Sequence, residues 1–580
     1  MSIEITTATA SQRTGIRGSL DVLPDGAPAA IRSVFTQAEF LAALAEAGDL
    51  VIRLCANIVL PSGRTTIAAG KGIEFAGFKL IKGSGSLLSF FGECIATRRQ
   101  IFSGFNAGDI VGIFGRTEIY PEWWGLQDGR HDIAINCAIQ SSTRAGAIGI
   151  TYPDWHGTTI SLAPRIYYVA RPIDCTGGYI NIKGSGSAQT TLLTTSAWVA
   201  DTWYQAEIWG DSTLNVPNHA AVIWIGGLYT DAGNANGATY RNQVTGVHID
   251  CGPAGFALRT TNKRISGISS KSGVEECSII DEVVITYATG FGIGFCRHRA
   301  LDGSYPPATV NGLSISNFWI YGATYRDYYG MYFSQWTNNC HVDTGTIAGG
   351  LSKSISPQWG VNTSPAPAGV GFDTDPNGPR AVIYPDPIWI RTYPQAAIHA
   401  SGYLTLNNVH IEGSMFGVFV AESSGANNIT INNVKTFGLM DRQRLPAPVY
   451  MLDGTSGAAP PADDGTTLNY YGYGCAVLIA GHAEALANPR VNAKGCCTIT
   501  NLSSSGTAYL IRDSVYNIHL TAFGQGQFAL SPTGEGSGGR VAFYTRGNIY
   551  RVIPGSPPTL GQYNPASPPT DRTYFLGPIY

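Results

Sequence analysis

The chain has 580 residues, of which 44% are hydrophobic and only 13% are charged, and its formal net charge is −3. This balance leaves no basic stripe for a nucleic acid, and no stretch is apolar for long enough to cross a membrane. The 11 cysteines are odd in number and scattered, which excludes the framework of a disulfide-rich secreted protein. The N-terminal residues do not form a signal peptide, so we expect folding in a reducing cytoplasm.

The first 125 residues are predicted to form a leader and a capping head. Residues 1–34 are polar and contain Gly and Pro, which is typical of a flexible leader. In the head, 35–125, the pattern from Thr36 to Glu39 is a capping box that opens a short helix, and Gly48 is its expected stop. An aromatic turn at Tyr120–Trp124 leads into a second helix. Short helices early in the chain suit a repetitive fold whose open end needs a cap.

The region 126–455 repeats a short phrase: apolar, two small or polar residues, apolar, His, apolar, acid. It reads VTGVHID at Val244–Asp250 and LNNVHIE at Leu406–Glu412, with a looser copy, TNNCHVD, at Thr337–Asp343. Copies that lack the His or the acid are Ile280–Thr286, Ile315–Tyr321 and Ile431–Phe437. The alternation is strand periodicity, and gaps of 22 to 69 residues between copies rule out adjacent hairpins. The phrase therefore predicts a parallel β-solenoid whose equivalent residues stack about 4.8 Å apart.

The remaining segments complete the predicted domain organisation. Two long irregular stretches, 195–243 and 346–400, are expected to be loops that carry function. After residue 455 the phrase fades, so 456–580 is predicted to be a β-rich C-terminal region for trimerisation or glycan binding. The predicted fold class is all-β: a parallel β-helix with short N-terminal capping helices.

Three segments carry a likeness to a known family: YPEWWGLQDGRHDIAINCAIQ at Tyr120–Gln140, YYVARPIDC at Tyr167–Cys175 and INIKGSGSAQTTL from Ile180. With them the chain resembles the phage tailspike and pectate-lyase-like right-handed parallel β-helix proteins, although the usual acidic GDGVTDD is shortened to QDGRHD. The resemblance implies a homotrimer that binds and cleaves a bacterial capsular or exopolysaccharide. It also implies a place on the virion tail, reached from the host cytoplasm without a leader, with the N-terminus joined to other tail proteins. The family shares no catalytic motif and assigns no catalytic residue here.

Stacking the phrases predicts two outward columns on one sheet face. One column holds Asp250, Thr286, Tyr321, Asp343, Glu412 and Phe437. The other holds His248, Val284, Trp319, His341, His410 and Lys435. Glycan cleavage needs this mixture, because one carboxylic acid protonates the leaving oxygen, a second carboxylate acts as base or nucleophile, and aromatic faces hold sugar rings.

The leading hypothesis is an endo-acting depolymerase that hydrolyses glycosidic bonds, with Glu412 as acid or nucleophile and Asp343 as its partner. Contacts with sugar are expected from a larger group: His410, His341, Asp250, Trp319, Tyr321 and Trp336. The 69 residues between the two acids are one coil plus the loop 346–400, which puts them about 5 Å apart, or three coils, which puts them about 14 Å apart. The proline-rich stretch 359–387 favours one coil, whereas a strand-like run at Val382–Tyr393 favours three.

Other interpretations stay open at this point. The members of a histidine column point in parallel and do not converge, so neither a metal site nor a cofactor is predicted. Asn317, Asn339, Asn408 and Asn433 are interpreted as corner or ladder residues. A second enzyme hypothesis is β-elimination from a uronic-acid polymer, with Lys435, Arg297 or Arg391 to neutralise the carboxylate. A third hypothesis is a non-catalytic adhesin that only binds glycan.

Overall fold

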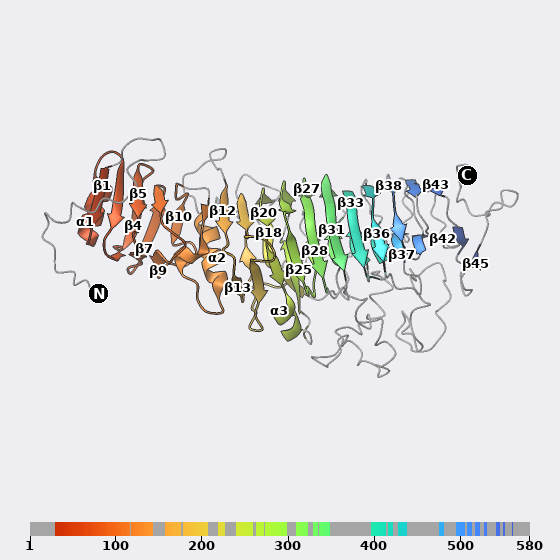
Figure 1. The fold of residues 1–580 in the computed structure, drawn as a ribbon, viewed down its shortest axis with the longest axis horizontal. Coiled ribbons are helices and arrows are strands. Elements are labelled where there is room, and N and C mark those ends of the chain that lie inside the picture. The colour runs from red at the N-terminus through yellow and green to blue at the C-terminus, as the bar shows by residue number, and fades with distance from the viewer. Residues whose placement is uncertain are drawn as a thin grey trace. The chain divides into compact units, whose positions relative to one another are not determined.

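Figure 1 shows the computed structural model, in which the chain forms two compact units. The first unit is Met1–Leu162 with Tyr179–Asn181, and the second is Ala163–Gly178 with Ile182–Tyr580. The structure describes residues 30–115, 118–142, 157–175, 178–206, 218–226, 239–258, 261, 263–271, 273–298, 309–322, 329–334, 336–348, 396–412, 414, 416–421, 427–437, 475–480, 495–504, 507–512, 517–522, 527–530, 541–545, 549–551 and 559–560.

The first unit is built from parallel strands that stack in three sheets. One sheet contains β1 (Ala30–Val34), β2 (Leu50–Leu54), β5 (Lys71–Glu74) and β8 (Glu93–Ile95). The other two contain β4 (Gly63–Ile67), β7 (Ser86–Phe90) and β10 (Ile110–Gly112), and β3 (Ile58–Val59), β6 (Leu80–Ile81) and β9 (Phe102–Ser103). The register pairs Leu50 with Lys71 and Gly72 with Glu93, so one coil takes 21 residues. Because β1 begins at Ala30, the coils start at the end of the predicted leader 1–34 and run through the predicted head 35–125, ahead of residue 126.

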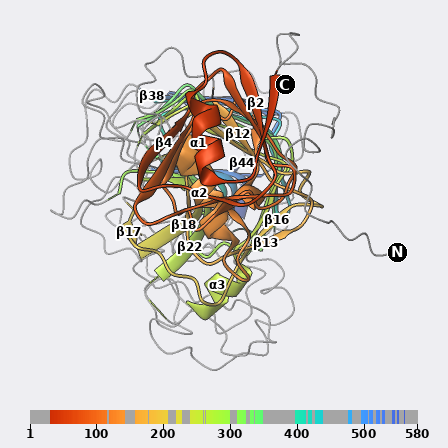
Figure 2. The same cartoon turned by 90° about the vertical axis from the view of Figure 1, so that its left-hand side faces the viewer.

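Helix α1 (Gln37–Ala45) begins at the predicted capping box. The backbone N–H of Glu39 donates to Thr36 Oγ1 at 3.2 Å, and the N–H of Thr36 donates to the Glu39 carboxylate at 3.2 Å. The helix ends at Ala45, ahead of Gly48, which lies in the left-handed region with φ 79°. Figure 2 shows α1 across the end of the first coil, where it covers strand edges that would otherwise be open.

The aromatic turn and the second helix are also confirmed, as η2 (Pro121–Trp124) and α2 (His131–Ser142). Trp123 is fully buried and donates its indole N–H to the carbonyl of Thr97 at 3.0 Å. Its ring packs 5.8 Å from that of Phe114, so the turn belongs to the core of the first unit. None of the helices in the described part of the chain has the length and apolar character needed to span a membrane.

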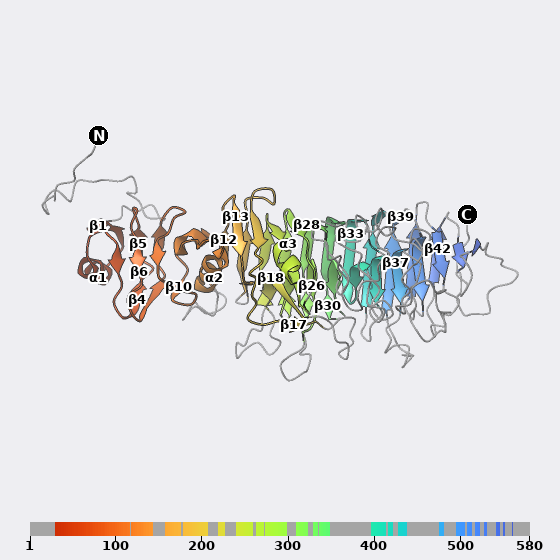
Figure 3. The ribbon, with the colours of Figure 1, turned by 90° about the horizontal axis from the view of Figure 1, so that it is seen from below.

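The second unit also winds through three parallel sheets (Figure 3). The first sheet includes β16 (Thr191–Thr194), β21 (His248–Asp250), β25 (Val283–Thr286), β28 (Ser314–Tyr321), β31 (Cys340–Ala348), β33 (Tyr403–Glu412) and β36 (Lys435–Phe437). The second includes β14 (Ile173–Asp174), β18 (Asn218–Gly226), β22 (Lys263–Ser270), β26 (Ile293–Phe295), β29 (Met331–Phe333), β32 (Ala396–Ala400), β34 (Phe416–Ala421) and β37 (Cys475–Ala480). The third contains β19 (Thr239–Tyr240), β23 (Val274–Glu275), β27 (Val310–Asn311) and β30 (Thr337–Asn338).

This topology confirms the predicted parallel β-helix. Its core contains one isoleucine from each of five successive coils, and all five are fully buried: Ile249, Ile285, Ile320, Ile347 and Ile411. The coils continue past residue 455 as β37, β40 (Thr507–Arg512), β42 (Gln527–Leu530) and β44 (Ile549–Arg551). Of the predicted loop 195–243, β18 is a sheet strand, and most of 346–400 lies outside the described residues. The ten cysteines whose side chains are described are all free thiols.

Four successive coils each turn at two residues in the left-handed backbone region that lie five positions apart. The pairs are Arg241 and Gly246, Glu276 and Asp281, Gly312 and Asn317, and Asn339 and Thr344. All four asparagines of the phrase have φ between 50° and 54°, which confirms them as corner residues. However, Asn339 occupies the first corner of its coil, whereas Asn317, Asn408 and Asn433 occupy the second. An alignment that places all four asparagines at the same corner therefore misplaces the copy at Thr337–Asp343 by five residues.

Candidate functional site

Two outward columns follow the second corner along β21, β25, β28, β31, β33 and β36. The register gives the first column as Asp250, Thr286, Tyr321, Ala348, Glu412 and Phe437. It gives the second as His248, Val284, Trp319, Thr346, His410 and Lys435. Both columns agree with the predicted ones except at β31. There Ala348 and Thr346 stand in place of Asp343 and His341.

The predicted stacking of Asp343 with Glu412 is therefore wrong in register. β31 and β33 are neighbours, as the one-coil interpretation requires, but Asp343 lies opposite Asn407 and Glu412 lies opposite Ala348. Five residues of strand separate the two positions, which is about 15 Å at the rise of a β-strand. Carboxyl pairs in glycosidases stand about 5 to 9.5 Å apart. Asp343 is consequently too far from Glu412 to share its chemistry within one chain.

Asp343 begins a ladder of amide side chains instead. Its Oδ1 accepts hydrogen bonds from Asn407 Nδ2 and Asn408 Nδ2, both at 2.9 Å. Asn432 Nδ2 donates to Asn407 Oδ1 at 2.7 Å, and Asn433 Nδ2 donates to Asn408 Oδ1 at 2.6 Å. Cross-strand pairs of this kind hold neighbouring coils in register. The predicted ladder role is confirmed for Asn408 and Asn433, and Asp343 belongs to the same ladder.

Glu412, His410 and Tyr321 form a group of titratable side chains in the columns. His410 and Glu412 are two residues apart on β33 and therefore share a face, with His410 Nε2 3.9 Å from Glu412 Oε1. Their side chains are 40% and 42% exposed, so both are open to solvent. Burial, and then the negative charge of Glu412, raise the pKa of the Tyr321 phenol. Because only Ala348 separates the two positions in the column, the phenol and the carboxylate interact across it.

Aromatic and basic side chains flank this group. Trp319 stands beside Tyr321 on β28 and is half-buried, and Thr346 separates it from His410 in the second column. Lys435 is exposed and lies directly next to His410 on the neighbouring strand, about 4.8 Å away between backbones. Phe437 takes the same place next to Glu412 and is 60% exposed. One sheet face thus presents an acid, an imidazole, a phenol, an ammonium group and two aromatic rings.

The structure places the other predicted residues away from this group. Asp250 lies four strands from Glu412, and its Oδ1 accepts from the N–H of Gly252 at 2.8 Å, at the start of α3 (Gly252–Ala257). His341 lies in the column before the corner, between Ser314 and Thr405. Trp336 precedes β30 in the third sheet, and the Arg297 guanidinium stands 5.1 Å above its ring. The expected platform of three aromatic rings is therefore reduced to Trp319 and Tyr321.

Thr346 and Ala348 are the members of the columns that the sequence interpretation missed. Their signal was the run Thr346-Ile347-Ala348, in which the fully buried Ile347 lies between two residues that the register places in the columns, as in the other coils. The corner before it is Thr344, and threonine rarely adopts a positive φ, so its residue type did not indicate a corner. Arg391, one of the cations considered for elimination, lies outside the described residues.

Comparisons with known proteins found likeness at the level of solved structures. No family model and no curated protein matches the sequence. A tailspike of an Acinetobacter phage, vb_AbaP_AS12 gp42, matches with 10% identity over 95% of this chain and 78% of that chain, at a TM-score of 0.36. ORF18 of Geobacillus virus E2 matches with 11% identity over 70% of this chain, at a TM-score of 0.34, and 62% of that protein is covered. An alginate lyase from Paenibacillus sp. str. FPU-7 matches with 10% identity over 85% of this chain and 99% of that chain, at a TM-score of 0.27.

Proposed function

We propose that this chain binds and cleaves a polysaccharide on the face formed by Trp319, Tyr321, His410, Glu412 and Lys435. The observation that carries the proposal is the register, which places these five side chains in two outward columns, with only Thr346 and Ala348 of β31 between the β28 pair and the β33 pair. Aromatic rings offer apolar faces to sugar rings, and the polar groups between them can hold hydroxyls and move protons. In a chain with so few charged residues, this concentration of reactive groups is unusual.

Of the reactions considered, β-elimination from a uronic-acid polymer fits the assembled groups best. Hydrolysis needs a second carboxylate near Glu412, and Asp343, the predicted partner, is about 15 Å away. Elimination needs a base, a proton donor and a cation beside the uronate carboxylate. His410 and Lys435 can supply the base and the cation from the neighbouring strands β33 and β36, and Tyr321 can supply the proton from β28, on the other side of β31. We therefore place the lyase hypothesis ahead of hydrolysis.

In the proposed step, His410 removes the proton from C5 of the uronate, with Glu412 holding its imidazole. The electron pair left on C5 forms the C4–C5 double bond as the bond from C4 to the glycosidic oxygen breaks. That oxygen takes the proton of the Tyr321 phenol, which the raised pKa keeps in place at neutral pH. Lys435 pairs with the uronate carboxylate and stabilises the charge that develops beside it. The products are an unsaturated sugar end and a new reducing end.

The proposal also includes the setting that the sequence resemblance implies. We propose a homotrimer on a virion tail, attached to other tail proteins through its N-terminus, with a bacterial surface polysaccharide as substrate. The parallel β-helix supports this setting because its repeated coils build a long outer wall for a polymer. Mass measurement of the purified protein tests the trimer, and a mass of one chain would contradict it.

The reaction is tested by incubating purified protein with uronic-acid polysaccharides and following ultraviolet absorbance and reducing ends together. Elimination raises both signals, hydrolysis raises reducing ends alone, and a non-catalytic adhesin binds the polymer but changes neither. Tyr321→Phe and His410→Gln should each lower kcat/KM by about 100-fold or more. Tyr403→Phe and His341→Gln are the matched controls, because both residues are exposed on the same sheet outside the reactive group. Loss of activity in the controls but not in the variants would contradict the assignment.

A further inference from the structure

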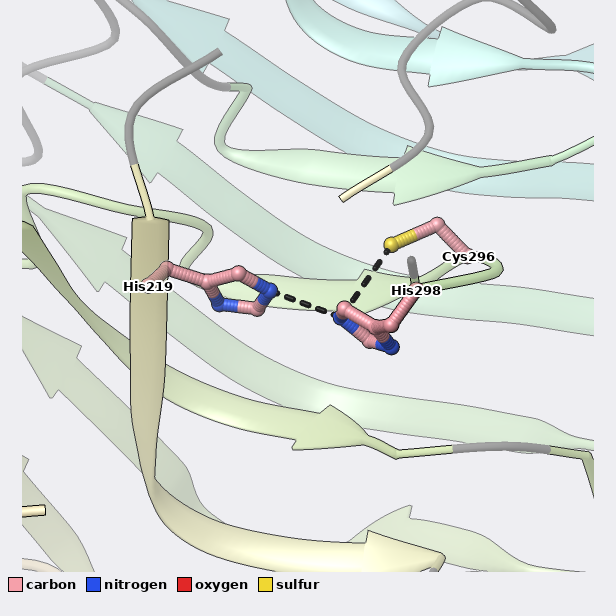
Figure 4. A group of neighbouring side chains, drawn as sticks. All are labelled: His219, Cys296 and His298. Carbon is pink, nitrogen blue, oxygen red and sulfur yellow. Dashed lines mark hydrogen bonds between the residues drawn. The ribbon is translucent and has the colours of Figure 1, made fainter. Parts of the chain in front are cut away.

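Three side chains that are far apart in sequence meet on the second sheet of the second unit. His219 lies on β18, and Cys296 and His298 follow the end of β26. Figure 4 shows the two imidazoles facing each other, with the Cys296 sulfur directed at the same place. His219 Nε2 lies 2.7 Å from His298 Nε2, and Cys296 Sγ lies 3.7 Å from His298 Nε2. The three potential ligand atoms all lie within 4.8 Å of one another.

The group is enclosed by the protein. His219, Cys296 and His298 are 0%, 1% and 3% exposed. The rings of Tyr204 and Trp224 lie 5.4 Å and 5.8 Å from that of His298. Converging polar groups in such a dry place need partners, because their desolvation is otherwise costly. No polymer could reach the group, so it plays no part in the reaction proposed above.

The second nitrogen of each imidazole is held by the surrounding structure. His219 Nδ1 lies 2.9 Å from Ser266 Oγ, and His298 Nδ1 lies 3.3 Å from the carbonyl oxygen of Lys271. Histidines that ligate a metal characteristically use the far ring nitrogen for such a hydrogen bond, which fixes the ring and its tautomer. Here both Nδ1 atoms are engaged in this way. Both Nε2 atoms are thereby aimed at one point beside the Cys296 sulfur.

We propose that His219, Cys296 and His298 bind a zinc ion. A set of two imidazoles and one thiolate suits a tetrahedral zinc ion, and the thiol loses its proton when the metal binds. Ligands at usual zinc distances stand about 3.3 Å apart for two nitrogens and about 3.6 Å apart for nitrogen and sulfur. The observed 3.7 Å between sulfur and nitrogen already agrees, and the imidazoles must separate by about 0.6 Å. A water molecule would take the fourth position.

The ion would link β18 to the chain after β26, and these two strands are separated by β22 and do not pair with each other. Ala206 forms an antiparallel bridge with His298, and β17 (Tyr204–Gln205) pairs antiparallel with β18 at Tyr204 and His219. A short segment therefore runs back across the sheet at the same place. A metal held by β18 and by the chain after β26 would fix this crossing. The site is thus expected to act on stability and not on cleavage.

The test begins with untagged full-length protein from zinc-supplemented cells, with metal measured per chain by elemental mass spectrometry. We expect about one zinc per chain. After exchange for cobalt, a thiolate-to-cobalt charge-transfer band should appear in the near ultraviolet, because Cys296 is a ligand. A folded wild-type protein that holds less than about a tenth of an equivalent of zinc and shows no such band overturns the proposal, since the imidazoles then form only a hydrogen-bonded pair.

Variants give a second readout. Cys296→Ser should abolish the charge-transfer band and lower zinc occupancy at least about tenfold, and His219→Gln should lower occupancy by a similar factor. Cys251→Ser is the matched control, because Cys251 is equally buried but is not a member of the group. Equal loss of zinc and of the band in the control would overturn the assignment. If the ligand variants fail to fold, the wild-type zinc and cobalt measurements decide the question by themselves.

Discussion

Replacement of Asp343 tests whether this residue stabilises the amide ladder, as the structure indicates, or takes part in catalysis, as its sequence position predicts. Asp343→Ala removes the two hydrogen bonds, both 2.9 Å long, that this carboxylate accepts from Asn407 and Asn408. At about 1 kcal/mol for each bond between partly exposed groups, the free energy of unfolding should fall by about 2 kcal/mol. Asp343→Asn keeps an acceptor oxygen with weaker neutral bonds and should cost about 1 kcal/mol or less.

The assay follows the unfolding rate in guanidinium by tryptophan fluorescence, together with the initial rate of polymer cleavage. If the ladder breaks only after the transition state for unfolding, Asp343→Ala should unfold faster by a few-fold at most. If it breaks before that point, a loss of about 2 kcal/mol corresponds to about 30-fold. Cleavage by Asp343→Asn should stay within about twofold of wild type, because the carboxylate is about 15 Å from Glu412.

Glu412→Gln should have the opposite effects to replacement of Asp343: it should lower cleavage without changing stability. Its contact with His410 is 3.9 Å long and partly exposed, so its loss should leave the unfolding rate unchanged. Cleavage should fall by about 100-fold, since His410 loses the group that holds it. Abolished cleavage in Asp343→Asn with normal unfolding would refute both the register argument and the ladder role.

Three further variants test separate parts of the structure. Thr344→Asn should slow unfolding by about fivefold, because a β-branched residue with φ 52° is strained by about 1 kcal/mol and asparagine tolerates this corner. Lys435→Met should weaken binding of acidic polymers but not of neutral ones, measured by calorimetry, if the ammonium group pairs with a uronate. Burial lowers the pKa of His248, whose Nε2 lies 2.9 Å from Thr286 Oγ1. Below the ordinary pKa of 6.5, His248 therefore binds more protons in the unfolded chain than in the folded one. The free energy of unfolding falls as pH drops from 6.5 through the lowered pKa of the folded state. His248→Gln should flatten the acid limb of the unfolding rate.

Each of these outcomes has a direct contradiction. Faster unfolding of Thr344→Asn would mean that threonine makes contacts worth more than the corner strain. If Lys435→Met weakens binding of neutral and acidic polymers equally, Lys435 does not pair with a uronate carboxylate. An unchanged acid limb in His248→Gln would show that other groups set the pH dependence in this window.

The sequence alone determined the local structure well. Alternating residues predicted strands, the Thr36 and Glu39 pair predicted the start of α1, and asparagine marked the left-handed corners. These features depend on neighbouring residues in the chain, so they can be read without knowledge of distant contacts. The spacing of the phrases likewise predicted a parallel β-helix, because each phrase buries the same face against the next coil.

Only the tertiary structure decided which side chains stand together. Asparagine suits both corners of a coil, and the corners lie five residues apart, so the sequence permitted Asn339 to be aligned one corner too late. Pairing of β31 with β28 and β33 over many residues resolved this choice and separated Asp343 from Glu412. The meeting of His219 with Cys296 and His298 was equally hidden, because it depends on how the coils stack and on a chain crossing that no local pattern encodes.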